Sequence, residues 1–173
     1  MTLAAPPGLV EALDADDSPA PIFALDDQAI ALRAIEAGVD EARGTGTRAA
    51  VCIANLAAID GSTAAGSAVL DAADAWLLSR LRANDRLYRV GGTFVIVASG
   101  LSHPHEGERL ADRVRALPGA GGETLNVGLA IYPIHGDDAT TLLDRARTSA
   151  HRATLRRRAT DPLAPALVAV GRS

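Results

Sequence analysis

The sequence contains no lysine and a single cysteine. All 17 basic residues are arginine, and we interpret this bias as the codon usage of a GC-rich genome rather than as a functional feature. Cys52 has no second cysteine with which to form an intramolecular disulfide. Chains without disulfides are typical of reducing compartments, so we expect a cytoplasmic protein.

The chain is also poor in aromatic residues and in long apolar runs. Aromatic side chains make up 3% of the residues, too few for the stacking platforms that bind single-stranded nucleic acid. The formal net charge of −4 argues against general binding to phosphate backbones. No run of about 18 apolar residues is present to cross a bilayer, and the N-terminus does not resemble a signal peptide. We expect neither a nucleic-acid partner nor a membrane partner.

The overall composition is that of a globular chain. Its 173 residues are 48% hydrophobic and 22% charged, which fits one domain with short extensions. Residues 1–24 are rich in Pro, Ala and Asp and predict a poorly ordered leader. The periodic patterns all fall within residues 25–173.

Hydrophobic periodicity predicts an α+β fold. Apolar steps of three and four predict helices from Asp26 or Asp27 to Ala42, around 70–81, around 110–117, and after Asp137 or Asp138. Strands are predicted at 49–56, on both sides of a turn within 85–100, and at 124–133, where alternation indicates one buried face; 166–170 is a candidate edge strand. This order is a ferredoxin-like βαββαβ core after a leading helix, with helices packed on a mostly antiparallel sheet.

Four segments resemble the GGDEF family of diguanylate cyclases in order and spacing. They are RANDRLYRVGGTFVIV (82–97), LADRVRAL (110–117), TLNVGLAIYP (124–133) and TLLDRARTSAHRA (141–153). The resemblance covers roughly residues 25–160 and implies the GGDEF version of the ferredoxin-like fold. Members of this family are bacterial signalling enzymes that join two GTP molecules into cyclic di-GMP.

The signature hairpin of the family has changed in this chain. The family reads Gly-Gly-(Asp/Glu)-Glu-Phe, whereas this chain has Gly91, Gly92, Thr93 and Phe94. The segment is one residue short and lacks both carboxylates. The glycine pair retains the capacity for the positive φ angles of a tight hairpin turn.

Other positions that the resemblance implies for catalysis have changed as well. Alignment of the first strand puts Cys52 at the metal-binding Asp, Ala57 at a Lys, and Asp60 at the Asn that contacts guanine; Ser67 replaces a further Asp. Mg²⁺ in a two-metal site requires hard oxygen ligands. We therefore expect no metal, no cofactor and no cyclase activity.

An inhibitory site of the family has a counterpart here. In active cyclases it carries an Arg-x-x-Asp motif that ends five residues before the Gly-Gly, and Arg82 and Asp85 stand in that register. A guanidinium can donate two parallel hydrogen bonds to guanine O6 and N7, and a carboxylate accepts from N1 and N2. The family adds a second Arg from the following helix, for which Arg113 is the nearest match and Arg109 and Arg115 are alternatives.

The sequence therefore predicts a degenerate GGDEF domain that binds cyclic di-GMP through Arg82, Asp85 and Arg113 without turning over GTP. Binding would alter contacts with an unidentified protein partner or with a second copy of the chain. Two alternatives stay open. One is a nucleotide-independent interaction or dimerisation module, in which Asp85 only holds a turn, and the other is residual GTP chemistry with non-standard ligands.

Two further segments have less specific interpretations. Residues 19–42 resemble the fourth strand and helix of response-regulator receiver domains; they are either a receiver remnant or, as we prefer, a helix of the GGDEF domain itself. His103 and His105 flank Pro104 in SHPHE (102–106), and we assign them to a solvated loop rather than to a metal site.

Overall fold

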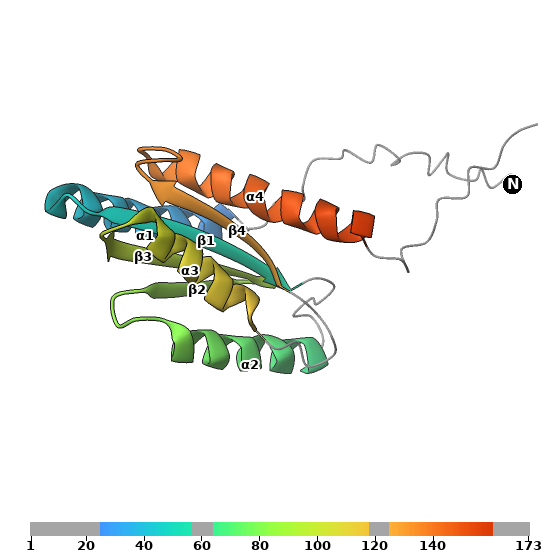
Figure 1. The fold of residues 1–173 in the computed structure, drawn as a ribbon. Coiled ribbons are helices and arrows are strands. Elements are labelled where there is room, and N and C mark those ends of the chain that lie inside the picture. Colours follow the sequence, from blue (N-terminus) through green and yellow to red (C-terminus); the bar gives the residue numbers. More distant parts are fainter. Residues whose placement is uncertain (1–24, 57–63, 118–124, 161–173) are drawn as a thin grey trace, which may run out of the picture.

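The computed structural model describes residues 25–56, 64–117 and 125–160 (Figure 1). The leader and the candidate edge strand at 166–170 lie outside these described residues. The described chain forms eight elements, in the order α1 (Leu25–Thr45), β1 (Arg48–Leu56), α2 (Ala64–Arg80), β2 (Arg86–Val90), β3 (Thr93–Leu101), α3 (Pro104–Arg115), β4 (Leu125–Tyr132) and α4 (Ala139–Thr160).

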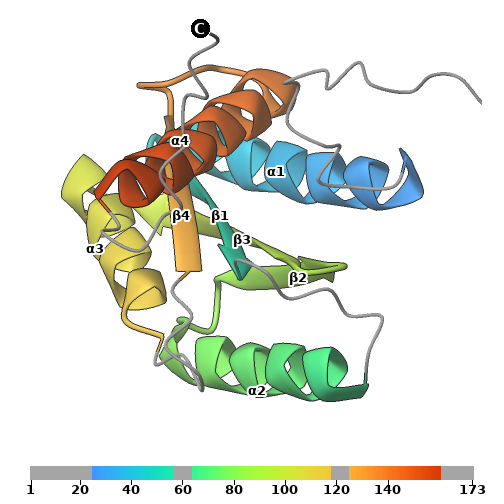
Figure 2. The same cartoon turned by 90° about the vertical axis from the view of Figure 1, so that its right-hand side faces the viewer.

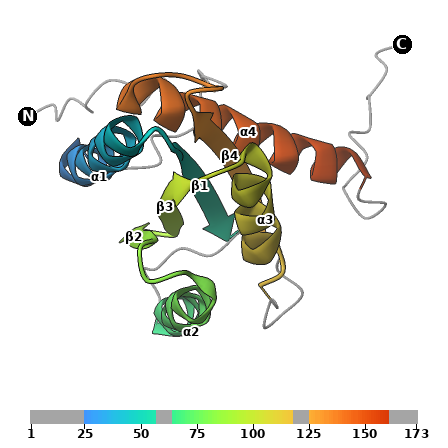
Figure 3. The same cartoon turned by 60° about the vertical axis from the view of Figure 1, so that its left-hand side comes forward.

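The strands form one four-stranded sheet in the order β2-β3-β1-β4. Each of the three neighbouring pairs is antiparallel. Helices α1 and α4 cover one face of this sheet, and α2 and α3 lie on the other (Figures 2 and 3). The arrangement is a βαββαβ core preceded by a helix, so the predicted α+β, ferredoxin-like fold is confirmed.

The central strand β1 divides its side chains between two apolar layers. Ala50, Cys52 and Ala54 belong to the layer under α2 and α3, whereas Val51 and Ile53 belong to the layer under α1 and α4. A strand covered on both faces has to be apolar at successive positions. This explains the continuous apolar run in the sequence.

The prediction of one buried face for β4 was wrong, because helices cover this strand on both sides. Val127 and Ile131 pack in the layer of α2 and α3, and Ala130 packs in the layer of α4. At Gly128 helix α4 approaches so closely that an added Cβ would collide with the carbonyl oxygen of Ala146. A glycine is therefore required there for α4 to reach the sheet.

The start of α3 corrects the loop assignment of His105, whereas His103 lies outside the helix as predicted. His103 has extended backbone (φ −133°, ψ 149°) and directly precedes the helix, whose first residue is Pro104. His105 therefore lies in the first turn, and the two imidazole rings stack with their centroids 5.3 Å apart. Proline suits the first helical position because its missing N–H would have no partner there.

The ends of α1 and α4 show which aspartates cap helices. Helix α1 already begins at Leu25, so Asp26 and Asp27 lie inside its first turn and not before it, contrary to the prediction. Asp138 does cap α4, because its Oδ1 accepts a hydrogen bond from the N–H of Thr141 at 2.9 Å. Within the described residues no helix is long and apolar enough to span a bilayer.

Candidate functional site

The β2–β3 hairpin brings Gly91, Gly92, Thr93 and Phe94 to the end of the sheet where β1 finishes. Gly91 has a φ of 57°, as the tight turn requires. Thr93 is 7% exposed and lies opposite Asn55 of β1, and its Oγ1 donates a hydrogen bond to Asn55 Oδ1 at 2.6 Å. Phe94 is fully buried. The hydroxyl of Thr93 in the hairpin is therefore paired with an amide side chain of the neighbouring strand.

Cys52 lies three residues before Asn55 on the same strand and is completely buried. Burial raises the pKa of the Cys52 thiol to about 12, although the positive charge of Arg115 acts in the opposite direction. A neutral, inaccessible thiol is neither a nucleophile nor a metal ligand. In this structure Cys52 is a core side chain.

The remaining aligned positions add no metal ligand set. Ser67 is half-buried in the first turn of α2, and Asp60 falls outside the described residues. Among the residues that are described, no three His, Cys, Asp or Glu side chains gather closely enough to hold a metal ion. At this end of the sheet Thr93 and Phe94 are packed, and the nearby Arg89 of β2 is joined in ion pairs to Asp71 and Asp74 of α2 at 2.8 and 3.2 Å.

Arg82 and Asp85 lie in the connection between α2 and β2, where they close a turn. The backbone N–H of Arg82 donates to Asp85 Oδ2 at 2.8 Å, and the N–H of Asp85 donates back to the carbonyl oxygen of Arg82 at 3.0 Å. Such aspartate-closed turns are locally stable. The Arg82 side chain itself is 56% exposed.

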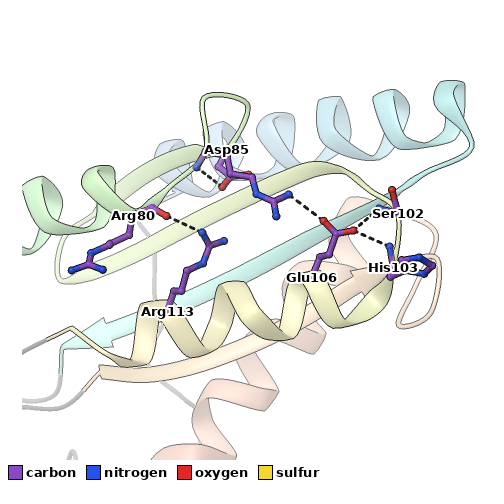
Figure 4. Close-up of polar contacts among 7 residues, drawn as sticks. Arg80, Asp85, Ser102, His103, Glu106 and Arg113 are labelled. Atoms are coloured by element: carbon purple, nitrogen blue, oxygen red, sulfur yellow. Dashed lines mark hydrogen bonds and ion pairs between the residues drawn. The ribbon is translucent and has the colours of Figure 1, made fainter.

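Glu106 of α3 joins this turn to the start of the helix (Figure 4). Its Oε2 accepts a hydrogen bond from Arg82 Nη1 at 3.1 Å, and its Oε1 accepts from the backbone N–H groups of Ser102 (2.9 Å) and His103 (3.1 Å). The bond from the His103 N–H, followed by those from Arg82 and Ser102, lowers the pKa of the Glu106 carboxyl. Its carboxylate is therefore ionised at neutral pH.

Arg113 projects from the same side of α3 as Glu106, two turns further along the helix (Figure 4). Its Nη1 donates to the carbonyl oxygen of Arg80, the last residue of α2, at 3.1 Å. Its Nε is buried and has no hydrogen-bond partner in the part of the chain that is described. Since Glu106 contacts Arg82 and Arg113 contacts Arg80, α3 holds both ends of the segment that leaves α2.

The alternative arginines of α3 are placed differently. Arg115 pairs with Asp112 of its own helix at 2.6 Å, and Arg109 is exposed. Neither has a hydrogen bond to the α2–β2 connection among the contacts of the described residues. Of these three arginines, Arg113 is the one that contacts α2.

We call Arg82, Asp85, Glu106 and Arg113 the α2–α3 corner. Three of these residues were predicted from sequence, but Glu106 was missed. A signal for it was present, because a proline followed two residues later by glutamate is typical of the first and third positions of a helix. The corner combines two guanidinium groups with two carboxylates, which is suitable for a ligand with both acceptors and donors along one edge.

Comparison with solved structures agrees with this architecture. The GGDEF domain of PA1120 (YfiN or TpbB) from Pseudomonas aeruginosa has a TM-score of 0.66 at 23% identity, over 75% of this chain and 89% of that one. This chain has the GGDEF fold.

Two other GGDEF structures are comparably similar. A microbial GGDEF domain studied with bis-(3′,5′)-cyclic di-GMP has a TM-score of 0.61 at 21% identity, over 72% of this chain and 84% of that one. The diguanylate cyclase SiaD from P. aeruginosa, in complex with its activator SiaC, has a TM-score of 0.60 at 20% identity, over 74% of this chain and 54% of that one. No family model matches the chain, and no curated protein matches its sequence.

Proposed function

We propose that this GGDEF-fold protein is a receptor for cyclic di-GMP that does not synthesise it. The observation that carries the proposal is the α2–α3 corner, where Arg82 and Asp85 of the α2–β2 connection lie near α3, which carries Arg113. Guanine presents O6 and N7 as acceptors and N1 and N2 as donors, so an arginine and a carboxylate match its two edges. A related fold studied with cyclic di-GMP supports this choice of ligand.

The packing of side chains at the hairpin end supports the absence of turnover. Joining two GTP molecules is a phosphoryl transfer, which depends on metal ions held by hard oxygen ligands. Thr93 and Asn55 are bonded to each other at 2.6 Å, and Cys52 is buried with a strongly raised pKa. We therefore propose that the domain signals by contact with a protein partner or a second copy of the chain.

A nucleotide-independent interaction module is the second candidate. It is favoured by the contacts that Arg82 and Asp85 already make within the chain, because Asp85 closes the turn and Arg82 pairs with Glu106. In that case the motif stabilises the α2–β2 connection and has no ligand. The fold would then serve as a docking or dimerisation surface.

Calorimetric titration of the full chain with cyclic di-GMP tests the proposal. We expect a Kd of about 1 μM or tighter, roughly −8 kcal/mol, and a loss on the order of fiftyfold in Arg82→Ala. Arg33→Ala is the matched control, because Arg33 is exposed on α1 across the sheet. No binding by the unaltered protein, or equal binding by Arg82→Ala, would favour the interaction module.

Incubation with GTP tests the absence of synthesis separately. The full chain is incubated with GTP and either Mg²⁺ or Mn²⁺, and the products are separated by chromatography. We expect no cyclic di-GMP. Metal-dependent formation of the dinucleotide would contradict the proposal and would indicate a ligand set that includes residues outside the described segments.

A further inference from the structure

The guanidinium of Arg82 makes one hydrogen bond within the protein and is otherwise exposed to solvent. At its backbone, the N–H of Arg82 is fixed by Asp85 Oδ2 at 2.8 Å. At its tip, Nη1 donates to Glu106 Oε2 at 3.1 Å. No other hydrogen bond of the Arg82 side chain occurs within the described residues, and the side chain is 56% exposed. Its Nη2 and Nε therefore keep donors for a ligand.

Glu106 is the fixed partner of this pair. Its side chain is only 19% exposed, and its second oxygen is bound by the backbone N–H groups of Ser102 and His103 at the start of α3. These two bonds do not depend on Arg82. A carboxylate at a helix N-terminus is also favoured by the helix dipole. Glu106 therefore remains in place when Arg82 moves, and it sets the position to which the guanidinium returns.

We propose that Glu106 is a positioning residue of the cyclic di-GMP site, which holds the Arg82 guanidinium over the side of α3 that carries Arg113 before the ligand arrives. This inference rests on the proposed function. A flexible arginine loses rotamer freedom when it binds, and that loss weakens affinity. Because of its contact with Glu106, the Arg82 side chain has already lost much of this rotamer freedom in the free protein. The guanidinium is then presented with two free donor groups, Nη2 and Nε, near the helix that carries Arg113.

The opposite role, in which Glu106 competes with the ligand for Arg82, is less consistent with the geometry. A guanidinium has five N–H donors in a planar fork, and the contact with Glu106 uses one nitrogen. A competing carboxylate would block the site most effectively if it took both edges of the fork. The sign of the effect of a Glu106 substitution distinguishes the two roles.

The test is a double-mutant cycle in full-length protein with cyclic di-GMP as the titrant. Glu106→Gln weakens binding about fivefold in the unaltered background, and has no effect in the Arg82→Ala background. Glu108→Gln is the matched control, because it removes the same charge from an exposed position on α3. A second variant, Glu106→Asp, keeps the charge, but its side chain is too short to reach Arg82 and the start of α3 together. It weakens binding similarly, and it provides an independent test if Glu106→Gln fails to fold.

The outcomes separate this inference from the proposed function. If Glu106→Gln binds as tightly as the unaltered protein, or more tightly, the positioning role is overturned while the receptor role stands. An equal loss in both backgrounds also overturns it, because Glu106 would then act only through the stability of α3. If the unaltered protein does not bind cyclic di-GMP at all, the proposed function fails first, and the inference fails with it.

Discussion

The hairpin end of the sheet and the α2–α3 corner differ in the kind of side chain that each presents. At the hairpin end, Thr93 is 7% exposed and bonded to Asn55, and Cys52 lies in the apolar core. At the corner, Arg82 is 56% exposed and paired with an ionised carboxylate. In the first region the side chains of Thr93 and Cys52 are packed inside the fold, whereas in the second Arg82 presents its charge to solvent.

This difference shows why a motif has to be judged by its surroundings. A hydroxyl or thiol that packs against neighbours contributes to stability and is costly to replace with a charge. A charge at a half-exposed corner contributes little to stability and can be exchanged between internal and external partners. Substitutions at the hairpin end should therefore lower the free energy of unfolding, and substitutions at the corner should weaken ligand binding. The largest effect is expected at the hairpin end.

The largest effect is expected from introducing a carboxylate at position 52. Cys52→Asp places an ionisable group among apolar side chains with 0% exposure, which costs on the order of 3–5 kcal/mol. Chemical denaturation in urea measures the loss, with Cys52→Ala as the uncharged control. A stable Cys52→Asp variant whose melting temperature rises with Mg²⁺ would show that this region can hold a metal ion. The contrast between a packed hairpin end and a ligand-binding corner would then be wrong.

At the corner, Arg113→Ala should weaken cyclic di-GMP binding on the order of thirtyfold, because it removes a charged donor from the site. We expect the thermal stability of this variant to change little, since the side chain of Arg113 contributes one hydrogen bond to the backbone carbonyl of Arg80. Arg115→Ala, whose partner is Asp112, serves as the control in the same titration. A greater loss of affinity in Arg115→Ala would mean that the second arginine is misassigned.

Thr93→Val should have the reverse profile. It removes the hydroxyl that bonds Asn55 Oδ1 and leaves that oxygen without its donor, at a cost of about 1–2 kcal/mol of unfolding free energy. The affinity for cyclic di-GMP should be unchanged. Thr148→Val, at an exposed position of α4, is the control for the change in side chain. A loss of affinity in Thr93→Val would place the hairpin in the ligand site.

The smallest effect is a pH dependence confined to the corner. The folded-state pKa of Glu106 is lowered, so its contribution to stability is present at neutral pH and is lost as the pH falls through that pKa. The difference in melting temperature between the unaltered protein and Glu106→Gln should therefore shrink as the pH falls below the ordinary pKa of a glutamate carboxyl. Thr93→Val should show no such trend, since neither Thr93 nor Asn55 titrates in that range.

Much of this molecule could be predicted from local sequence. Hydrophobic periodicity located the helices and strands, because each element has to present an apolar face with its own repeat. The turn at Gly91 and a cap of α4 by Asp137 or Asp138 were also predicted. Each depends only on the backbone conformation of a single residue or on one short-range hydrogen bond. The candidate arginine and aspartate of the corner were found from their register relative to Gly91.

Tertiary structure decided the features that depend on what packs against each residue. The second buried face of β4 exists because α4 docks at Gly128, a contact between segments that the local pattern does not encode. The bond of Thr93 with Asn55 depends on the register of two strands 38 positions apart. Above all, the partner of Arg82 is Glu106, 24 residues away, and only the approach of α3 to the α2–β2 connection brings the two charges together.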